Sequence, residues 1–268
     1  MRSPHPTTVT PRLAATTLIV RDADAGLEVL MVRRSLQASF MPGAYVFPGG
    51  AVDGADGAAH HQAACDEAPA RLTQRIGVVT EVGDQALAYA VAALRECFEE
   101  CGLWLGAPDH HAPAAGWATL RARLHAGETL AALAADAGGP LATSALQPWS
   151  RWVTPVGLPK RFDTLFFVAR APAGQVPEVD AGETTTLAWV HPPAALDALG
   201  RGEFPMEFAT VSTVESLRPF ASVAELLAHA AAQTRLPPLH PRLKLDAQGR
   251  ISGVLVPGQA GYDQAHGA

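Results

Sequence analysis

Two apolar runs near the amino terminus predict a pair of neighbouring strands. They cover residues 12–22 (RLAATTLIVRD) and 27–35 (LEVLMVRRS), and the segment between them has Asp and Gly where a tight turn favours them. A third short strand is expected at 44–47 (AYVF), and residues 48–50 (PGG) should end it.

A strongly helical pattern covers residues 85–101, and Gly102 is well placed to end that helix. The Ala-rich segments on either side, at about 54–84 and 107–148, lack a sharp periodicity and are interpreted as insertions. We expect one short helix near 62–74 in the first insertion and a further helical segment in the second.

The remainder of the chain returns to strands and then to helices. Strands are expected at 150–155, 161–170 and 184–190, helices at about 192–200, 208–217 and 222–234, and a hairpin within 243–256. Because strands and helices alternate irregularly, this pattern favours an α/β (α+β) fold with a mixed sheet covered by helices. We expect one domain over residues 1–268, with a helical and hairpin extension from about 200 to 268.

The composition is typical of a globular protein without a nucleic-acid or membrane partner. The chain has 268 residues, 48% of them hydrophobic, and a net charge of −6, and no basic stripe offers a surface for nucleic acid. Its three cysteines form no CxxC pair, which favours a reducing compartment over a disulfide framework. No signal-peptide core, membrane-length apolar run or terminal SKL address is recognisable, so a cytoplasmic location is expected.

The most informative segment is 95–103 (RECFEECGL). On a helix, at about 100° per residue, Glu96, Glu99 and Glu100 share an arc of roughly 100°. Three like charges so close together repel each other. Clustered carboxylates are, however, what Mg²⁺ or Mn²⁺ requires, because hard cations favour oxygen ligands. Arg95 precedes Glu99 by four residues and could hold its carboxylate in an ion pair, although an ordinary acidic helix surface remains an alternative.

The opposite face of this predicted helix is apolar and is expected to pack against the sheet. Its side chains are those of Leu87, Val91, Leu94 and Phe98.

A second informative segment is 47–50 (FPGG). Its two adjacent glycines would let the chain approach a ligand or a packed helix closely. Taken alone, the segment could equally be a tight turn.

Together these segments resemble the Nudix box, G-x5-E-x7-R-E-U-x-E-E-x-G-U, in which U is an aliphatic residue. Residues 95–103 match the second half and Gly50 the first, with about thirty extra residues between the halves. Counting back from Arg95 places Leu87 where the pattern has its first Glu, and counting forward from Gly50 also yields no Glu. The role of that Glu is therefore open, and Asp53 is a candidate for an auxiliary carboxylate.

An interrupted box of this kind is similar to that of one Nudix subgroup, the peroxisomal coenzyme A diphosphatases. The upstream residues are also similar to the coenzyme A signature, L-L-T-x-R-(S/A)-x3-R-x3-G-x3-F-P-G-G. The positions that fit are Arg34, Ser35, Gly43 and Phe47 to Gly50, whereas Val32 replaces the Thr and Ser39 replaces the second Arg. Downstream, residues 161–164 (RFDT) before an apolar strand resemble the same subgroup.

The resemblance implies an α/β/α sandwich with helical insertions, and it assigns roles to residues of this chain. Glu96, Glu99 and Glu100 would be ligands of Mg²⁺ or Mn²⁺, and Arg95, Glu99 and Glu100 would act in catalysis. The implied substrate-binding residues are Arg34, Phe47, Gly49, Gly50 and Arg161. Because strand alternation lets only one of Arg33 and Arg34 reach a phosphate easily, the signature match favours Arg34. The general base stays open: Glu100 is one candidate and Glu183 a distant one.

The implied function is metal-dependent hydrolysis of the diphosphate linkage of a small molecule. Coenzyme A or an acyl-coenzyme A would give 3′,5′-ADP and 4′-phosphopantetheine. Two alternatives stay open: a Nudix pyrophosphatase for NADH, ADP-ribose or a dinucleotide, favoured by Ser39 at the second Arg position, and a non-catalytic ligand sensor of the same fold. The insertions could shape the pocket or mediate a homodimer.

Overall fold

The computed structural model describes residue 4 and residues 9–37, 41–79, 82, 85–106, 112–180 and 184–266. Its centre is a seven-stranded mixed sheet. The long strand β1 (Arg12–Ala23) pairs antiparallel with β2 (Gly26–Arg34) and parallel with β6 (Phe162–Arg170), and β5 (Gln147–Val153) pairs antiparallel with β6. β3 (Tyr45–Val46) and β7 (Thr184–Val190) pair with β2, and β4 (Gly49–Ala51) pairs with β1.

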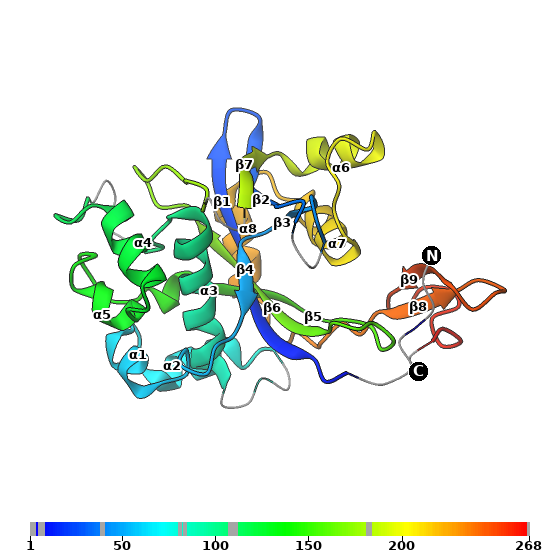
Figure 1. Ribbon diagram of the computed structural model, residues 1–268, viewed down its shortest axis with the longest axis horizontal. Coiled ribbons are helices and arrows are strands. Elements are labelled where there is room, and N and C mark those ends of the chain that lie inside the picture. Colours follow the sequence, from blue (N-terminus) through cyan, green and yellow to red (C-terminus); the bar gives the residue numbers. More distant parts are fainter. Residues whose placement is uncertain are drawn as a thin grey trace.

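Helices cover both faces of this sheet (Figure 1). One layer contains α1 (Ala59–Ala64), α2 (Pro69–Ile76), α3 (Ala86–Cys101), α4 (Trp117–His125) and α5 (Leu130–Ala134). The other contains α6 (Pro192–Gly200), α7 (Phe208–Leu217) and α8 (Val223–Ala231). A separate hairpin of β8 (Arg242–Leu245) and β9 (Ile251–Leu255) extends from one end of the molecule.

The alternation of side chains along the strands explains the two layers. Ile19 and Leu30 belong to an apolar core with α3, whereas the neighbouring positions Leu18 and Val29 belong to a core with α8. Successive residues of a strand point to opposite faces, so strands with apolar residues at every position are buried on both sides. The predicted α/β class and the α/β/α sandwich are confirmed.

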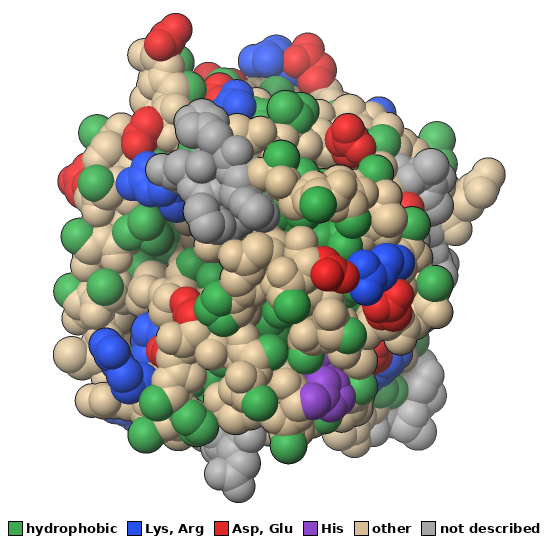
Figure 2. Space-filling view, turned by 90° about the vertical axis from the view of Figure 1, so that its left-hand side faces the viewer, with side chains coloured by type: hydrophobic (Ala, Val, Ile, Leu, Met, Phe, Trp, Pro, Cys, Tyr) green, Lys and Arg blue, Asp and Glu red, His purple; other side chains and the backbone are tan. Residues whose placement is uncertain are grey.

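The two insertions form one continuous layer over α3. The amide of Leu141 donates to the carbonyl of Ala64 at 2.8 Å, and Asp66 accepts from the Thr143 hydroxyl at 3.1 Å. Arg75 of α2 donates to the Thr143 carbonyl at 2.8 Å. The expectation of one short helix in the first insertion is wrong, because α1 and α2 are two separate helices. Figure 2 shows this side of the molecule, where acidic and basic side chains are interspersed.

Helix α3 is buried on more sides than the sequence pattern predicts. The Cys97 thiol lies close to Thr17 of β1, so this small side chain faces the sheet. Phe98 points to the insertion layer instead, where its ring packs edge-on against Trp104 at 5.1 Å and Trp117 at 6.1 Å. The expectation that the face containing Phe98 packs against the sheet is therefore wrong. The insertions supply a second apolar partner, which a helical wheel does not reveal.

The glycine pair was predicted to end a strand, and the structure shows a different arrangement. After β3, Gly49 and Gly50 form most of the short strand β4, which pairs antiparallel with Ala14 to Thr16 of β1. The glycines therefore lie inside the sheet, directly beside α3. In the described part of the chain, no helix has both the length and the apolar character needed to cross a membrane.

The packing of Phe98 generates a stability prediction. Replacing Phe98 with Ala removes a ring that is 1% exposed and leaves a cavity beside Trp104 and Trp117. We expect the free energy of unfolding, measured by denaturant titration, to fall by about 3–5 kcal/mol. Leu36→Ala, at a side chain that is 76% exposed, is the control and should change it by less than about 0.5 kcal/mol. A similarly small effect at Phe98 would contradict the packing of the insertion layer on α3.

Candidate active site

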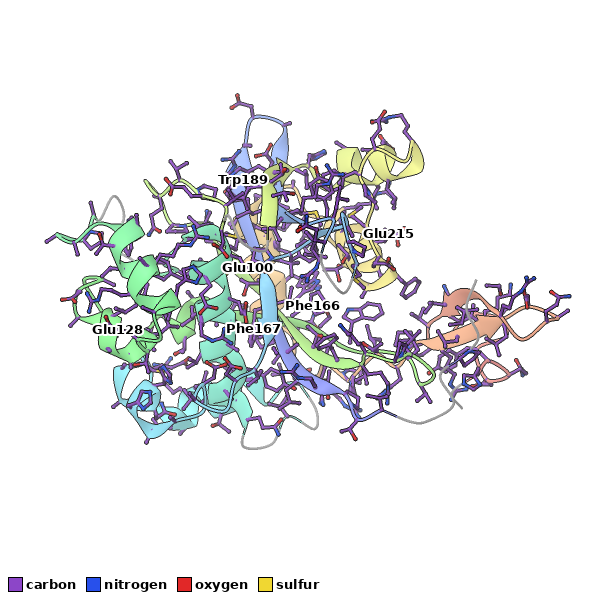
Figure 3. The ribbon with its side chains drawn as sticks, in the orientation of Figure 1. Glu100, Glu128, Phe166, Phe167, Trp189 and Glu215 are labelled. Atoms are coloured by element: carbon purple, nitrogen blue, oxygen red, sulfur yellow. The ribbon has the colours of Figure 1, made fainter. Side chains whose placement is uncertain are left out.

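The predicted site residues meet at one large cavity. The cavity has a volume of about 1180 Å³ and lies along β1, β4 and the second half of α3. Its lining includes eight of the residues singled out in the sequence: Arg34, Phe47, Gly49, Gly50, Glu96, Glu99, Glu100 and Arg161. Segments far apart in the sequence are thus brought to one place, and Figure 3 shows Glu100 near the centre of the molecule.

Arg95 is the centre of an ion-pair network beside this cavity. Its Nη1 donates to Glu96 Oε1 at 2.9 Å and to Glu99 Oε2 at 2.8 Å. Its Nε and Nη2 each donate to one oxygen of Asp56 at 3.1 Å, and Nη2 also donates to the carbonyl of Ala51 at 2.9 Å. One guanidinium therefore holds two carboxylates of α3 and joins them to β4 and the loop after it.

Asp56 is the residue that the sequence reasoning overlooked. It is the sixth residue after Gly50, the position of the first Glu in the box, and an Asp stands there in its place. Its side chain is buried and binds Arg95 through both oxygens. Asp53, the candidate proposed from sequence, is 65% exposed and lies 3.8 Å from Arg95. Searching for any carboxylate at that position, rather than for Glu alone, would have found Asp56.

The two glycines bring the backbone of β4 against the carboxylates. The amide of Gly49 donates to Glu100 Oε2 at 2.9 Å. A Cβ atom at Gly49 would lie 2.4 Å from the carbonyl oxygen of Ala15, and one at Gly50 would lie 2.3 Å from Glu96 Oε1. Both distances are shorter than van der Waals contact. At Gly49 the obstacle is the backbone of β1, so that position requires glycine, whereas a side chain at Gly50 would displace the Glu96 carboxylate.

Burial and mutual repulsion shape the charges of the acidic cluster. The pKa of Glu96 is raised to about 7. Burial is the largest cause, the charge of Arg95 opposes it, and the charge of Glu99 adds to it. The pKa of Glu99 is also raised, again chiefly by burial. For Arg95, burial alone would lower the pKa, but the hydrogen bonds of Asp56 and the charge of Glu96 reverse that effect and raise it. The carboxylates of Asp56, Glu96 and Glu99 therefore carry more negative charge than the single guanidinium of Arg95 neutralises.

This donor set fits a hard divalent cation. Glu96, Glu99 and Glu100 supply carboxylate oxygens from one side of α3, and all three line the cavity. Within the described ranges, no three His, Cys, Asp or Glu side chains are already grouped as a metal site. Arg95 binds Oε1 of Glu96 and Oε2 of Glu99, which leaves the second oxygen of each carboxylate as the candidate ligand atom.

The two neighbouring arginines of β2 have different surroundings, as strand alternation predicts. Arg34 lines the cavity. Arg33 instead donates to the carbonyl of Gly43 at 3.2 Å and lies 5.7 Å from the ring centre of Tyr45. Two further positions considered in the sequence, Ser39 and Glu183, lie outside the described residues.

The remaining predicted binding residues, Phe47 and Arg161, are both buried at the cavity wall. Phe47 packs edge-on against Phe166, with ring centres 6.4 Å apart. Arg161 donates from Nε to the carbonyl of Thr154 at 2.9 Å and from Nη1 to the carbonyl of Val9 at 2.6 Å.

Two of the cavity residues that the sequence did not single out lie close to the end of α3. His125, at the end of α4, lies 4.0 Å from Asp180, and both line the cavity. The amide of Asp180 donates to the carbonyl of Glu100 at 3.3 Å, which places its loop against the end of α3. No local pattern marks either residue, because their positions depend on how an insertion and a distant loop pack on α3.

Comparison with a solved structure defines the class of fold. The crystal structure of a Nudix hydrolase from Alicyclobacillus acidocaldarius aligns with a TM-score of 0.69 and 29% sequence identity. The alignment covers 83% of this chain and 97% of that one. The sheet, the covering helices and the acidic helix of this chain therefore belong to a Nudix hydrolase fold.

The family is shown by the sequence model of the NUDT19 Nudix domain, which matches residues 68–208, just over half of the chain. The chain belongs to this NUDT19 Nudix domain family. It is similar to the acyl-coenzyme A diphosphatase NUDT19 of Homo sapiens, with 29% identity over 242 residues covering 75% of this chain and 63% of the human protein. The Gallus gallus protein of the same name is 29% identical over 212 residues, covering 63% of this chain and 55% of that protein. The matches thus span less than two thirds of these relatives.

The bond between Asp56 and Arg95 can be tested directly. Asp56→Asn removes the buried charge that binds Arg95 through two oxygens, and we expect the free energy of unfolding to fall by about 3–5 kcal/mol. Asp53→Asn is the matched control, and because Asp53 is largely exposed it should cost less than about 1 kcal/mol. Equal effects of the two substitutions in a denaturant titration would show that Asp56 does not fix Arg95.

Proposed function

We propose that this protein is a metal-dependent diphosphatase that cleaves coenzyme A or an acyl-coenzyme A. The products would be 3′,5′-ADP and a 4′-phosphopantetheine. The observation that carries the proposal is the convergence of Glu96, Glu99 and Glu100 with the glycine strand β4 on one cavity. The similarity to two acyl-coenzyme A diphosphatases supports the choice of substrate.

The three glutamates of α3 would hold Mg²⁺ or Mn²⁺. The chemistry supplied by such a cation is neutralisation of phosphate charge and a lower pKa for an attacking water. Arg95 acts as a positioning residue. It holds Glu96 and Glu99 through hydrogen bonds and does not itself line the cavity.

Other residues of the cavity would bind and orient the diphosphate. Arg34 offers a guanidinium group that suits a phosphate oxygen. Glu100 is fixed by the amide of Gly49 and is 5% exposed, so it is our candidate for the group that accepts a proton from the attacking water. The close approach of Gly50 to Glu96 leaves no side chain between strand and helix to block the phosphates.

Metal binding has a readout that is independent of turnover. Because a ligand that binds only the folded state stabilises it, Mn²⁺ at one hundred times its Kd should add about 2.7 kcal/mol to the free energy of unfolding. Glu99→Gln should abolish most of this gain. Glu215→Gln on α7, far from Glu100 in Figure 3, should retain it. Stabilisation by Mn²⁺ that survives in Glu99→Gln would place the cation elsewhere.

Substrate identity is tested with a panel of coenzyme A, acetyl-coenzyme A, NADH, ADP-ribose and diadenosine polyphosphates, each with Mg²⁺ or Mn²⁺. We expect chromatography to show release of 3′,5′-ADP from coenzyme A or its acetyl ester. Turnover should fall by about 10²–10³-fold in the Glu99→Gln and Glu100→Gln variants, about the effect of losing one electrostatic group at a transition state. Preferred cleavage of another member would change the substrate and keep the metal chemistry, whereas no turnover of any member would favour the ligand sensor.

A further inference from the structure

Arg161 is a buried cation at the wall of the cavity, away from the acidic cluster. Its side chain is 8% exposed and lies just before β6. Its side chain donates to two neutral carbonyls, from Nε to Thr154 and from Nη1 to Val9. The third nitrogen, Nη2, donates to no other described residue.

No carboxylate in the described part of the chain forms an ion pair with Arg161, although a candidate is close in sequence. Asp163 lies two residues away, but both of its oxygens bind Arg151, at 2.7 and 2.6 Å. Arg151 is as deeply buried as Arg161 and has its full counter-charge. Burial lowers the pKa of Arg161, as expected for a cation without such a partner. A buried charge is costly unless an opposite charge accompanies it. The counter-charge of Arg161 is therefore expected from an anionic ligand in the cavity.

Arg12 adds a second guanidinium to the same wall. It is exposed, lines the cavity, and its side chain forms no hydrogen bond or ion pair with another described residue. Its backbone amide donates to the carbonyl of Arg161 at 2.9 Å, which joins the two residues where β1 and β6 begin. Lys160 also lines the cavity beside them.

These cations lie at a distance from the acidic cluster. Gly50, which approaches Glu96, pairs with Ala15 of β1. Arg12 precedes Ala15 by three residues, which corresponds to roughly 10 Å along a strand. The two phosphorus atoms of a diphosphate share one bridging oxygen, so a diphosphate held at the glutamates does not also occupy the position beside Arg12 and Arg161.

We propose that Arg161 and Arg12 form an anion subsite for a phosphate monoester of the substrate, separate from the diphosphate that is cleaved. A phosphate monoester carries about −1.5 to −2 charges at neutral pH, which two guanidinium groups balance. Guanidinium groups also match the spacing of phosphate oxygens. This inference deepens the proposed function and rests on it, since it assigns a second group of the same substrate.

The first test measures binding without turnover. Adenosine 3′,5′-bisphosphate and adenosine 5′-monophosphate, which differ by one phosphate monoester, are titrated calorimetrically into the protein in EDTA. We expect the wild-type protein to bind the bisphosphate at least about tenfold more tightly, the effect of one or two charge-assisted hydrogen bonds. Arg161→Gln and, separately, Arg12→Gln should reduce this preference to less than about threefold.

Controls separate the subsite from general effects of charge and folding. Arg201→Gln removes an exposed arginine that is paired with Glu203 and does not line the cavity, and it should keep the wild-type preference. Arg161→Lys should restore part of the preference that Arg161→Gln loses. If Arg161→Gln fails to fold because the bonds to Thr154 and Val9 are lost, the exposed position Arg12 decides the question.

A kinetic comparison distinguishes failure of the subsite from failure of the proposed function. With coenzyme A and 3′-dephospho-coenzyme A as substrates, Arg161→Gln should raise KM for coenzyme A alone and leave kcat nearly unchanged. The reason is that the lost contact would be equally strong in the bound substrate and in the transition state. Equal wild-type affinity for the two adenosine nucleotides, or an equal loss for both in the variants, would overturn the subsite. A preserved binding preference without hydrolysis of coenzyme A would retain the subsite and reject the proposed reaction.

Discussion

The acidic site depends on the single guanidinium of Arg95. Glu96 and Glu99 would repel each other one turn apart on a helix, and Asp56 is buried beside them. Arg95 neutralises part of that charge and at the same time bonds the carbonyl of Ala51 in β4. Since a buried charge needs a partner, helix, strand and loop hold each other in place. The arginine thus joins the two halves of an interrupted motif across about thirty extra residues.

The extra residues change the surroundings of α3 rather than its active face. In a simple sandwich the outer side of such a helix would face solvent, and its large apolar residues would turn to the sheet. Here the insertion layer covers that outer side, so Phe98 packs among Trp104 and Trp117 while the small side chain of Cys97 lies beside the sheet. The same layer delivers His125 to the cavity. The insertions therefore take part in both the core and the wall of the site.

The cavity separates its charges along β1. Carboxylates of α3 gather where β4 pairs with Ala14 to Thr16, and Arg12 and Arg161 lie where β1 begins. This separation is compatible with a net charge of −6, because a divalent cation and a few positioned guanidiniums can attract phosphates locally. The positions of the charged groups in the cavity, rather than the net charge of the whole chain, decide which ligands it can bind.

The sequence alone determined the pair of strands near the amino terminus, the long helix ending at Gly102, and the acidic segment with its resemblance to the Nudix box. These features are local. The period of the hydrophobic residues, the glycine that ends a helix and the spacing of a motif each depend on residues that are close in the sequence. The predicted ion pair of Arg95 with Glu99 is confirmed. Tertiary structure decided that Asp56 also binds Arg95, that the glycines form a strand, and where α4 brings His125. Those outcomes depend on contacts between segments far apart in the chain, and no local pattern encodes which of several plausible partners lies within bonding distance.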